Sequence, residues 1–246
     1  MFSKTKQNKI EFFTDFEGLL DTPPQPANRF YPDWFKKTAA SHSIPPTQKF
    51  PLGISEALGL SNVNVTVRRC PGIISLLSEG YIVPLWSDHV VQVRPNTINA
   101  FAANHSGGIS LHSQQNQYKT MPLPEGYYPD AVKFTNPWKV VTPKGWSVLV
   151  MAPFYQFENR FQVLPGVVDA DSYHHIHVNT LFKSAPADHQ LKMGMPFIQV
   201  IPFERKALEM EVRHSTDQDK KRIENLRFKM DKFFAKNKAI KSESQD

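Results

Sequence analysis

Residues Gln162 to Arg205 limit the possible fold more than any other stretch of this chain. They run through an apolar segment, an acidic turn, an alternating segment, a polar loop, a glycine turn and a second apolar segment. Short apolar or alternating segments separated by turn residues are typical of β-strands. The stretch therefore predicts a β-rich core. Within it, the acidic turn from Gly166 to Tyr173 is the best candidate for a chemical site.

Long helices have little room in the rest of the chain, because its 246 residues include 20 prolines and 11 glycines. Proline removes a hydrogen bond inside a helix and clashes with the preceding turn. Tyr81 to Trp86 and Val90 to Arg94 predict strands, with Pro84 at an edge or a bulge. The run from Thr97 to Thr120 alternates around Ser106-Gly107-Gly108 and predicts a hairpin. We therefore expect an all-β fold.

The first fifty residues differ from the body in composition. Residues 1–50 set aromatic side chains among prolines, a pattern too irregular for a long helix and too aromatic for a free linker. We expect an extended arm that wraps over the body and is held there by Trp34 and Phe35. Two interpretations are open: the arm packs against the body, or it binds a partner. The β-rich body follows over residues 51–205.

The charged end of the chain, residues 206–246, predicts a helix and a frayed tail. Residues 216–238 contain neither proline nor glycine. Within them, apolar residues follow helical spacing on one face: Ile223, Leu226, Met230 and Phe233. This pattern indicates an amphipathic helix that packs back on the body or contacts another subunit.

Charge and cysteine content narrow the partners and the compartment. A net charge of +6 favours anionic partners, but the basic residues cluster partly in the tails, so nucleic acid is not an expected partner. The single cysteine, Cys70, excludes an internal disulfide and fits a reducing compartment. A buried structural thiol is favoured over a reactive one beside Arg68 and Arg69. No apolar run reaches the roughly 18 residues of a membrane span, so we expect no membrane contact and a cytoplasmic location, the host cytoplasm if the protein is viral.

Two histidines next to the acidic turn raise the question of a metal. His175 and His177 share one face of an expected strand, and Asp171 is close in sequence. Two imidazoles and a carboxylate form a ligand set suited to zinc or iron. Histidines two apart on an exposed strand are more commonly polar residues facing water. We therefore expect no metal, and these three residues are the candidates if one binds.

The order of motifs around the acidic turn resembles a known superfamily. A strand ending in Ala152-Pro153 is followed by the turn Gly166 to Tyr173 and then by Gly194 to Ile201, GMPFIQVI. This is similar to the dUTPase and dCTP deaminase superfamily, with its G-x-[IV]-D-x-x-Y turn and its later G-x-x-[IA]-x-Q-[LV]-[IV] strand. The resemblance covers residues 143–203. It implies the β-clip fold, a distorted antiparallel barrel, and a homo-oligomer such as a trimer.

The chain is also similar to a family of phage and marine-bacterial proteins to which we attach no activity. Three features carry this second resemblance: the WFK sequence in the arm, the Cys-Pro-Gly turn, and GYIVPLW. It implies a phage-type protein and nothing about chemistry.

The superfamily resemblance implies roles for four residues. Asp169 takes the place of the aspartate that activates the attacking water as a general base. Tyr173 takes the place of the aromatic residue under the deoxyribose, one position later because Ser172 is extra. Gly166 and Gln199 belong to the nucleotide-binding motifs. A catalytic site of this kind would use Mg²⁺ on the phosphates.

Departures from the superfamily pattern fall on its phosphate-binding parts. Phe154-Tyr155-Gln156 stands where the superfamily has Arg-Ser-Ser, His175 replaces a glycine, and the glycine-rich C-terminal clamp is absent. Lys144, Arg160 or Arg205 would have to supply the missing cations. We therefore favour a non-catalytic β-clip scaffold without a cofactor, a phage-type structural or host-interaction protein. The alternative hypothesis is a divergent enzyme that hydrolyses a nucleoside triphosphate with Asp169 as its base.

Overall fold

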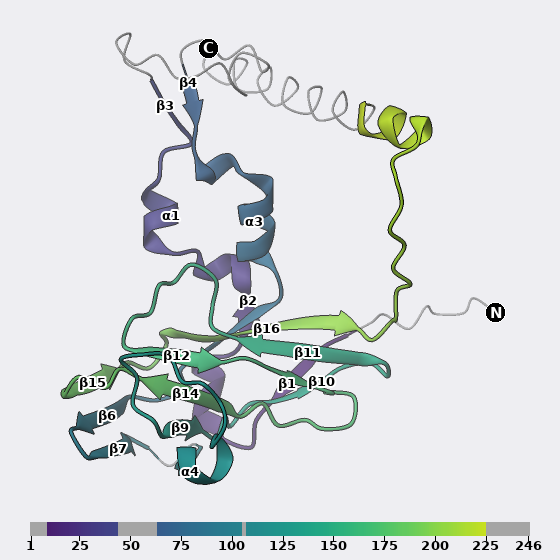
Figure 1. Ribbon diagram of the computed structural model, residues 1–246. Helices are drawn as coiled ribbons and strands as arrows, with labels where there is room; N and C mark the ends of the chain where they lie inside the picture. Colours follow the sequence, from purple (N-terminus) through teal and green to yellow (C-terminus); the bar gives the residue numbers. More distant parts are fainter. Residues whose placement is uncertain (1–8, 44–62, 105–106, 225–246) are drawn as a thin grey trace. The chain divides into compact units, whose positions relative to one another are not determined.

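The computed structural model describes residues 9–43, 63–104 and 107–224 (Figure 1). The chain divides into two compact units, each described by itself below. Unit 1 holds residues 1–40 and 67–206, and unit 2 holds residues 41–66 and 207–246.

Unit 1 consists mostly of antiparallel β-sheet, as the sequence predicts. Its largest sheet has the strand order β13-β11-β16-β5-β2; the others have the orders β12-β14-β9-β8, β15-β6-β7 and β1-β10. The strands are β1 Glu11–Phe13, β2 Gln25–Pro26, β5 Tyr81–Pro84, β6 His89–Arg94, β7 Thr97–Ala102, β8 Ile109–His112, β9 Ala131–Phe134, β10 Lys139–Val141, β11 Trp146–Met151, β12 Phe161–Leu164, β13 Gly166–Val168, β14 Val178–Phe182, β15 Ala187–Leu191 and β16 Pro196–Glu204.

The core of unit 1 follows from two different strand patterns. In β6, buried and half-buried residues alternate, so one face lies against the core and the other faces outward. In β16, Phe197, Ile198, Gln199 and Val200 are all buried in succession. Because β16 lies between β11 and β5 and is covered on both faces, it tolerates a continuous apolar run. Gln199 is therefore a polar group placed deep in the core.

Pro84 in β5 lies where the sequence expects it. The pairing of β5 with β16 shifts register between Pro196 and Ile198, and Pro84 pairs with Pro196 at that irregularity. A bulge suits proline, because proline has no backbone N–H to donate to the neighbouring strand.

The hairpin predicted around Ser106-Gly107-Gly108 is wrong. β7 pairs with β6, and β8 pairs with β9, so the two predicted arms belong to different sheets. Gly107 has φ +90°, and a Cβ there would lie 2.4 Å from the carbonyl oxygen of Thr135. The glycine therefore allows the chain to approach another backbone closely, which local sequence does not distinguish from a hairpin turn.

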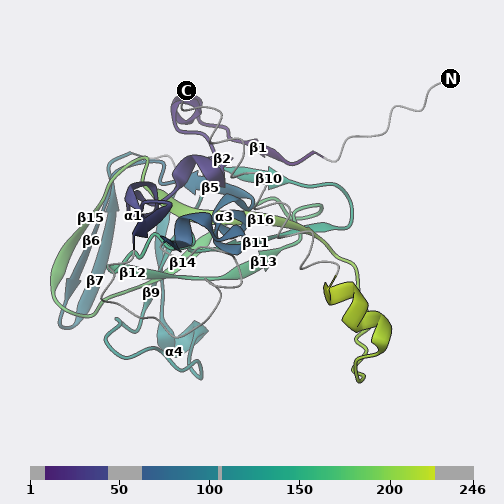
Figure 2. The same ribbon diagram turned by 90° about the horizontal axis from the view of Figure 1, so that it is seen from above.

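Short helices complete unit 1. They are η1 Glu17–Asp21, η2 Ala27–Phe30, α1 Asp33–Lys37, η3 Val67–Arg69, α3 Pro71–Ser78 and α4 Gln114–Gln117. Figures 1 and 2 both show α1 and α3 side by side. The hydroxyls of Tyr31 and Ser78 are hydrogen-bonded at 2.7 Å, and Phe35 is 1% exposed. Cys70, expected to be buried, is exposed just before α3.

Unit 2 is described only in part. β3 Ser41–Ser43 pairs antiparallel with β4 Val63–Val65. A helix over 217–224 begins after Thr216, whose hydroxyl accepts a hydrogen bond from the N–H of Asp219 at 3.3 Å. The Asp219 carboxylate in turn accepts the N–H of Thr216, which forms a capping box. Of the predicted apolar stripe, Ile223 is described and 64% exposed, whereas Leu226, Met230 and Phe233 lie outside the described residues.

Among the described residues, none of the helices has both the length and the apolar character that crossing a bilayer requires.

Candidate functional site

The acidic turn follows β13 and closes on the backbone of Asp169. The carbonyl oxygen of Asp169 accepts the N–H of Ser172 at 3.0 Å and the N–H of Tyr173 at 2.9 Å. Ala170, between the two acids, is fully buried. The turn is therefore anchored by an apolar residue at its centre, and the carboxylates of Asp169 and Asp171 lie on either side of that anchor in sequence.

One arginine holds both carboxylates. Asp171 accepts hydrogen bonds from Arg205 at 3.1 Å and 2.5 Å and from the N–H of Gly145 at 2.8 Å. Asp169 accepts a hydrogen bond from the Ser147 hydroxyl at 2.6 Å and lies 3.0 Å from Arg205. The side chain of Asp171 is 9% exposed, whereas that of Asp169 is 58% exposed. Asp171 is therefore a structural acid of the turn, and Asp169 is its solvent-facing acid.

The pKa of Asp171 lies below its usual range. The hydrogen bond from Arg205 is the main cause, followed by the N–H of Gly145. Because the folded protein favours the ionised carboxylate more than the unfolded chain does, this interaction contributes stability above the unfolded pKa of about 4. The contribution is lost as the pH falls below that value through the lower pKa of the folded state.

We expect Asp171→Asn to lower the melting temperature at pH 7 more than Asp169→Asn does. The asparagine loses the charge that faces Arg205, and it presents only one acceptor oxygen where the carboxylate has two. Thermal unfolding between pH 3 and pH 7 checks this: the gap between wild type and Asp171→Asn should begin to narrow below about pH 4, where the carboxyl of the unfolded wild-type chain becomes protonated, and narrow further toward the lower pKa of the folded state. An equal effect of both substitutions would contradict the division into a structural and a solvent-facing acid.

Gln199 is occupied by backbone groups. Its side-chain oxygen accepts the N–H of Phe154 at 3.1 Å, and its amide nitrogen donates to the carbonyl of Glu79 at 2.6 Å. The residue is 2% exposed. A buried amide must be satisfied within the protein, and both ends of this one are. Gln199 thus ties the loop after β11 to the turn before β5.

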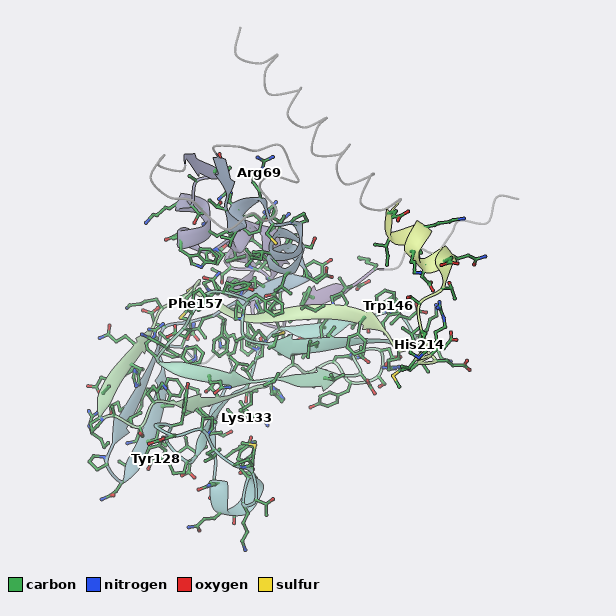
Figure 3. The ribbon with its side chains drawn as sticks, turned by 45° about the horizontal axis from the view of Figure 1, so that its top comes forward. Arg69, Tyr128, Lys133, Trp146, Phe157 and His214 are labelled. Carbon is green, nitrogen blue, oxygen red and sulfur yellow. The ribbon has the colours of Figure 1, made fainter. Side chains whose placement is uncertain are left out.

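The structure places Asp169 and Gln199 at opposite ends of the pair β11–β16. Ser147, which contacts Asp169, pairs with Phe203, whereas Gln199 pairs with Met151, four residues further along β11. Four strand residues span about 13 Å. Figure 3 shows the same separation, with Trp146 at one end of these strands and Phe157, close in sequence to the partner of Gln199, at the other. Within one chain, these two candidate residues do not converge.

The remaining candidates spread along the strand region near the turn. Tyr173 is 54% exposed, and its ring lies 5.6 Å from that of His175, which lies 5.4 Å from that of His177. Gly166 pairs with Val150 in the sheet, and space for a Cβ is open there. Asp171 points to Arg205 and Gly145, and the described residues contain no group of three metal-ligand side chains.

Three basic residues could have supplied the missing phosphate-binding cations. Two of them, Arg160 and Arg205, form ion pairs within the protein, and the third, Lys144, is exposed. Arg205 reaches the acidic turn, as above. Arg160 forms an ion pair with Glu158 at 2.5 Å and also donates to the Gln190 carbonyl. No two of these three cations share a described acceptor, so they do not form a common phosphate site in the described residues.

The loop after β11 has a backbone conformation that its sequence does not predict. Tyr155 has φ +57° and Phe157 has φ +51°, so both lie in the left-handed region that bulky residues seldom adopt. Each such conformation costs roughly 1–3 kcal/mol. Both side chains also face solvent, at 37% and 70% exposure. A loop that holds two exposed aromatic side chains in strained conformations is a candidate binding element.

Trp34 in α1 supports this loop. Its indole N–H donates to the carbonyl of Tyr155 at 2.9 Å, and its ring centroid lies 6.1 Å from those of Tyr155 and Phe157. The loop is further fixed by Gln156, whose amide donates to the carbonyl of Phe30 at 2.7 Å. We call Trp34, Tyr155 and Phe157 the aromatic surface. Beside it lies an open hollow of about 470 Å³, lined by Arg29, Phe30, Tyr31, Pro32, Asp33, Trp34, Lys36, Gln156 and Pro196.

No signal in the sequence marks this surface in advance. Tyr155 and Phe157 are not residues that favour a left-handed backbone, and Trp34 is more than a hundred positions away from both. The only hint is negative: apolar residues stand where the resembled superfamily has a phosphate-binding turn.

Comparisons with known proteins find similar solved structures but no similar sequence. No family model matches the chain, and no curated protein matches it in sequence. Among solved structures, it is similar to three single-residue variants of the dUTPase of Staphylococcus bacteriophage 80alpha, two of them with dUpNHpp. Two of the three are described as phage dUTPases that control transfer of virulence genes by a proto-oncogenic G protein-like mechanism.

The match to these dUTPases is distant. Identities are 10%, 9% and 10%, the matches cover 57%, 53% and 53% of this chain and 85%, 98% and 90% of those chains, and the TM-scores are 0.31, 0.27 and 0.27.

Proposed function

We propose that this chain is a non-catalytic β-clip scaffold, a homo-oligomeric phage-type structural or host-interaction protein that binds its partner through side chains of unit 1. A single observation carries the proposal: the candidate catalytic and nucleotide-binding groups are already bonded to the protein and lie apart. Ser147, which contacts Asp169, and Met151, which pairs with Gln199, are four positions apart on β11. Both ends of the Gln199 amide are used by backbone groups.

The loop after β11 supports the same proposal. A phosphate-binding turn needs free backbone N–H groups and nearby cations. Here the N–H of Phe154 is bonded to Gln199, and the following residues present aromatic side chains. A loop of this composition favours contact with apolar groups over contact with a triphosphate.

Oligomer formation is supported by an exposed apolar residue at a sheet edge. Val167 in β13 is 59% exposed, and β13 lies at the edge of its sheet. Edges of this kind pair with other strands unless they are protected. We infer self-association through such an edge, with a trimer as the form that the superfamily resemblance implies.

The alternative function, hydrolysis of a deoxynucleoside triphosphate, has one observation in its favour. Asp169 is 58% exposed, so a water molecule could reach it, and Mg²⁺ would then be required on the phosphates. Against this, the carboxylate of Asp169 already has protein partners: it accepts a hydrogen bond from the Ser147 hydroxyl at 2.6 Å and lies 3.0 Å from Arg205.

We expect neither turnover nor thermal stabilisation when the full chain is mixed with deoxynucleoside triphosphates and Mg²⁺. A ligand present at a hundred times its Kd stabilises a protein by about 2.7 kcal/mol, which would raise the melting temperature of a chain of this size by several degrees. Asp169→Asn is the control. Turnover that this substitution abolishes, with folding intact, would overturn the non-catalytic proposal and establish Asp169 as a base.

A further inference from the structure

The aromatic surface of unit 1 combines three rings that face one another at steep angles. The ring planes of Trp34 and Tyr155 meet at 73°, those of Tyr155 and Phe157 at 70°, and those of Trp34 and Phe157 at 43°. Edge-to-face contacts of this kind are favourable among the rings themselves. They also leave an uneven apolar surface with no pair of parallel faces.

This shape selects among ligands. Nucleobases stack on flat, exposed ring faces in succession along a strand, and three mutually tilted rings do not offer such a row. An uneven apolar surface instead accepts single aliphatic or aromatic side chains against its rings, as protein interfaces accept anchor residues. The rings therefore fit a protein segment better than a single-stranded nucleic acid.

The charge around the surface adds a second property of the partner. The hollow beside Trp34 is lined by two basic residues, Arg29 and Lys36, and one acidic residue, Asp33. Lys36 and Asp33 form an ion pair at 3.5 Å with each other, so their charges largely offset. Arg29 is exposed, and its described side-chain bond goes to the neutral amide of Gln25 at 3.3 Å. Lys37, three positions after Trp34 in α1, is also exposed and lies on the same side of the helical turn.

The backbone of the loop indicates that the surface is used. Tyr155 and Phe157 keep left-handed conformations that glycine or asparagine would adopt more easily. Phe157 is nevertheless 70% exposed, so burial in the core does not explain why an aromatic residue stands there. Strain of this kind is typically retained where the side chain contacts a ligand.

We propose that the aromatic surface is the docking site for a protein segment in which acidic side chains stand next to aliphatic or aromatic ones. The apolar side chains pack against Trp34, Tyr155 and Phe157, and the acidic side chains face Arg29 and Lys37. The proposal names the partner class of the scaffold and so rests on the proposed function.

Selection from a displayed library of random twelve-residue peptides tests this docking site. The full chain is immobilised, and Phe157→Asn is used in parallel. We expect peptides selected on wild type to be enriched in Asp or Glu next to Phe, Trp, Leu or Met. A synthetic peptide of the most enriched sequence should bind Phe157→Asn at least tenfold more weakly, as measured by fluorescence polarisation. Asparagine suits a left-handed backbone, so the melting temperature of this variant should be unchanged or higher.

Two further variants complete the test: one removes a charge beside the aromatic surface, and the other is a control outside it. Arg29→Ala should weaken binding severalfold and reduce its dependence on salt, because salt screens exposed charges. Phe101→Thr is the matched control: Phe101 is 55% exposed on β7, outside the aromatic surface, and its loss should leave the peptide affinity unchanged.

Three results would overturn the docking proposal. One is the absence of acidic and apolar enrichment; another is equal peptide affinity for wild type and Phe157→Asn. The third is self-association of the full chain that Phe157→Asn abolishes while no peptide is enriched, because the occupant would then be a second copy of this chain. The deoxynucleotide assay does not involve Phe157, so this inference and the proposed function can fail separately.

Discussion

Gly80→Ala is expected to lower the free energy of unfolding by about 3–5 kcal/mol. A Cβ at this position would lie 2.3 Å from the carbonyl oxygen of Val200 and 3.0 Å from the Cα of Ile201. Both neighbours are backbone atoms of the central strand β16, so they cannot rotate away.

The left-handed backbone of Gly80 adds to this cost. Its φ is +67°, a conformation that costs a residue with a side chain about 1–2 kcal/mol. Its carbonyl also accepts the N–H of Ala27 at 3.0 Å, so a shift that relieves the clash would break this contact with the start of η2. For a chain of this size, the expected change corresponds to a melting temperature lower by roughly 6–20 °C.

Gly126→Ala isolates the conformational part of the effect. Gly126 has φ +78°, and no heavy atom lies within 4 Å of a Cβ built there. We expect this variant to lose only about 1–2 kcal/mol, measured by denaturant unfolding alongside Gly80→Ala. Equal losses of unfolding free energy in the two variants would show that the clash between the added methyl group and β16 contributes nothing to the effect of Gly80→Ala.

Gln199→Leu is expected to lower the free energy of unfolding by about 2–4 kcal/mol, because each polar group that loses its partner costs about 1–3 kcal/mol. The N–H of Phe154 and the carbonyl of Glu79 both lose their side-chain partner. Leucine keeps much of the volume of glutamine, so a cavity contributes little to this loss. The loop that carries Tyr155 and Phe157 begins at Phe154, so Gln199→Leu should also weaken binding at the aromatic surface.

Gln162→Leu is the matched control for this residue type. Gln162 is exposed on the edge strand β12, and exposed substitutions usually change stability by less than about 0.5 kcal/mol. Chemical denaturation of both variants measures the difference. A Gln199→Leu variant as stable as wild type that had gained or lost nucleotide affinity would show instead that this amide serves a ligand.

Sequence reasoning was most successful where local pattern and tertiary environment agree. Alternation in Val90 to Arg94 predicts a strand, and His89–Arg94 is one. The apolar run before Arg205 predicts a strand, and Pro196–Glu204 is the central one. Pro84 was placed at an edge or a bulge, and it lies opposite the bulge. In each case a period of two or a missing N–H limits the backbone directly.

It was less successful where distant segments decide the geometry. The arms on either side of Gly107 alternate as a hairpin should, yet they pair with β6 and β9, because strand partners depend on which edges remain open in the folded sheet. The pairing of Asp171 with Arg205 spans 34 positions, so no local spacing distinguishes the structural acid from the solvent-facing acid of the turn.

The sequence by itself determined that this chain is mostly β-sheet and that its acidic turn stands between two strands. Both follow from side-chain periodicity and turn residues, which act over a few neighbouring positions. Only the tertiary structure decided that Asp169 and Gln199 lie at opposite ends of β11–β16, and that Trp34 meets Tyr155 and Phe157. These outcomes depend on strand register and on backbone φ values fixed by contacts between residues far apart in the chain.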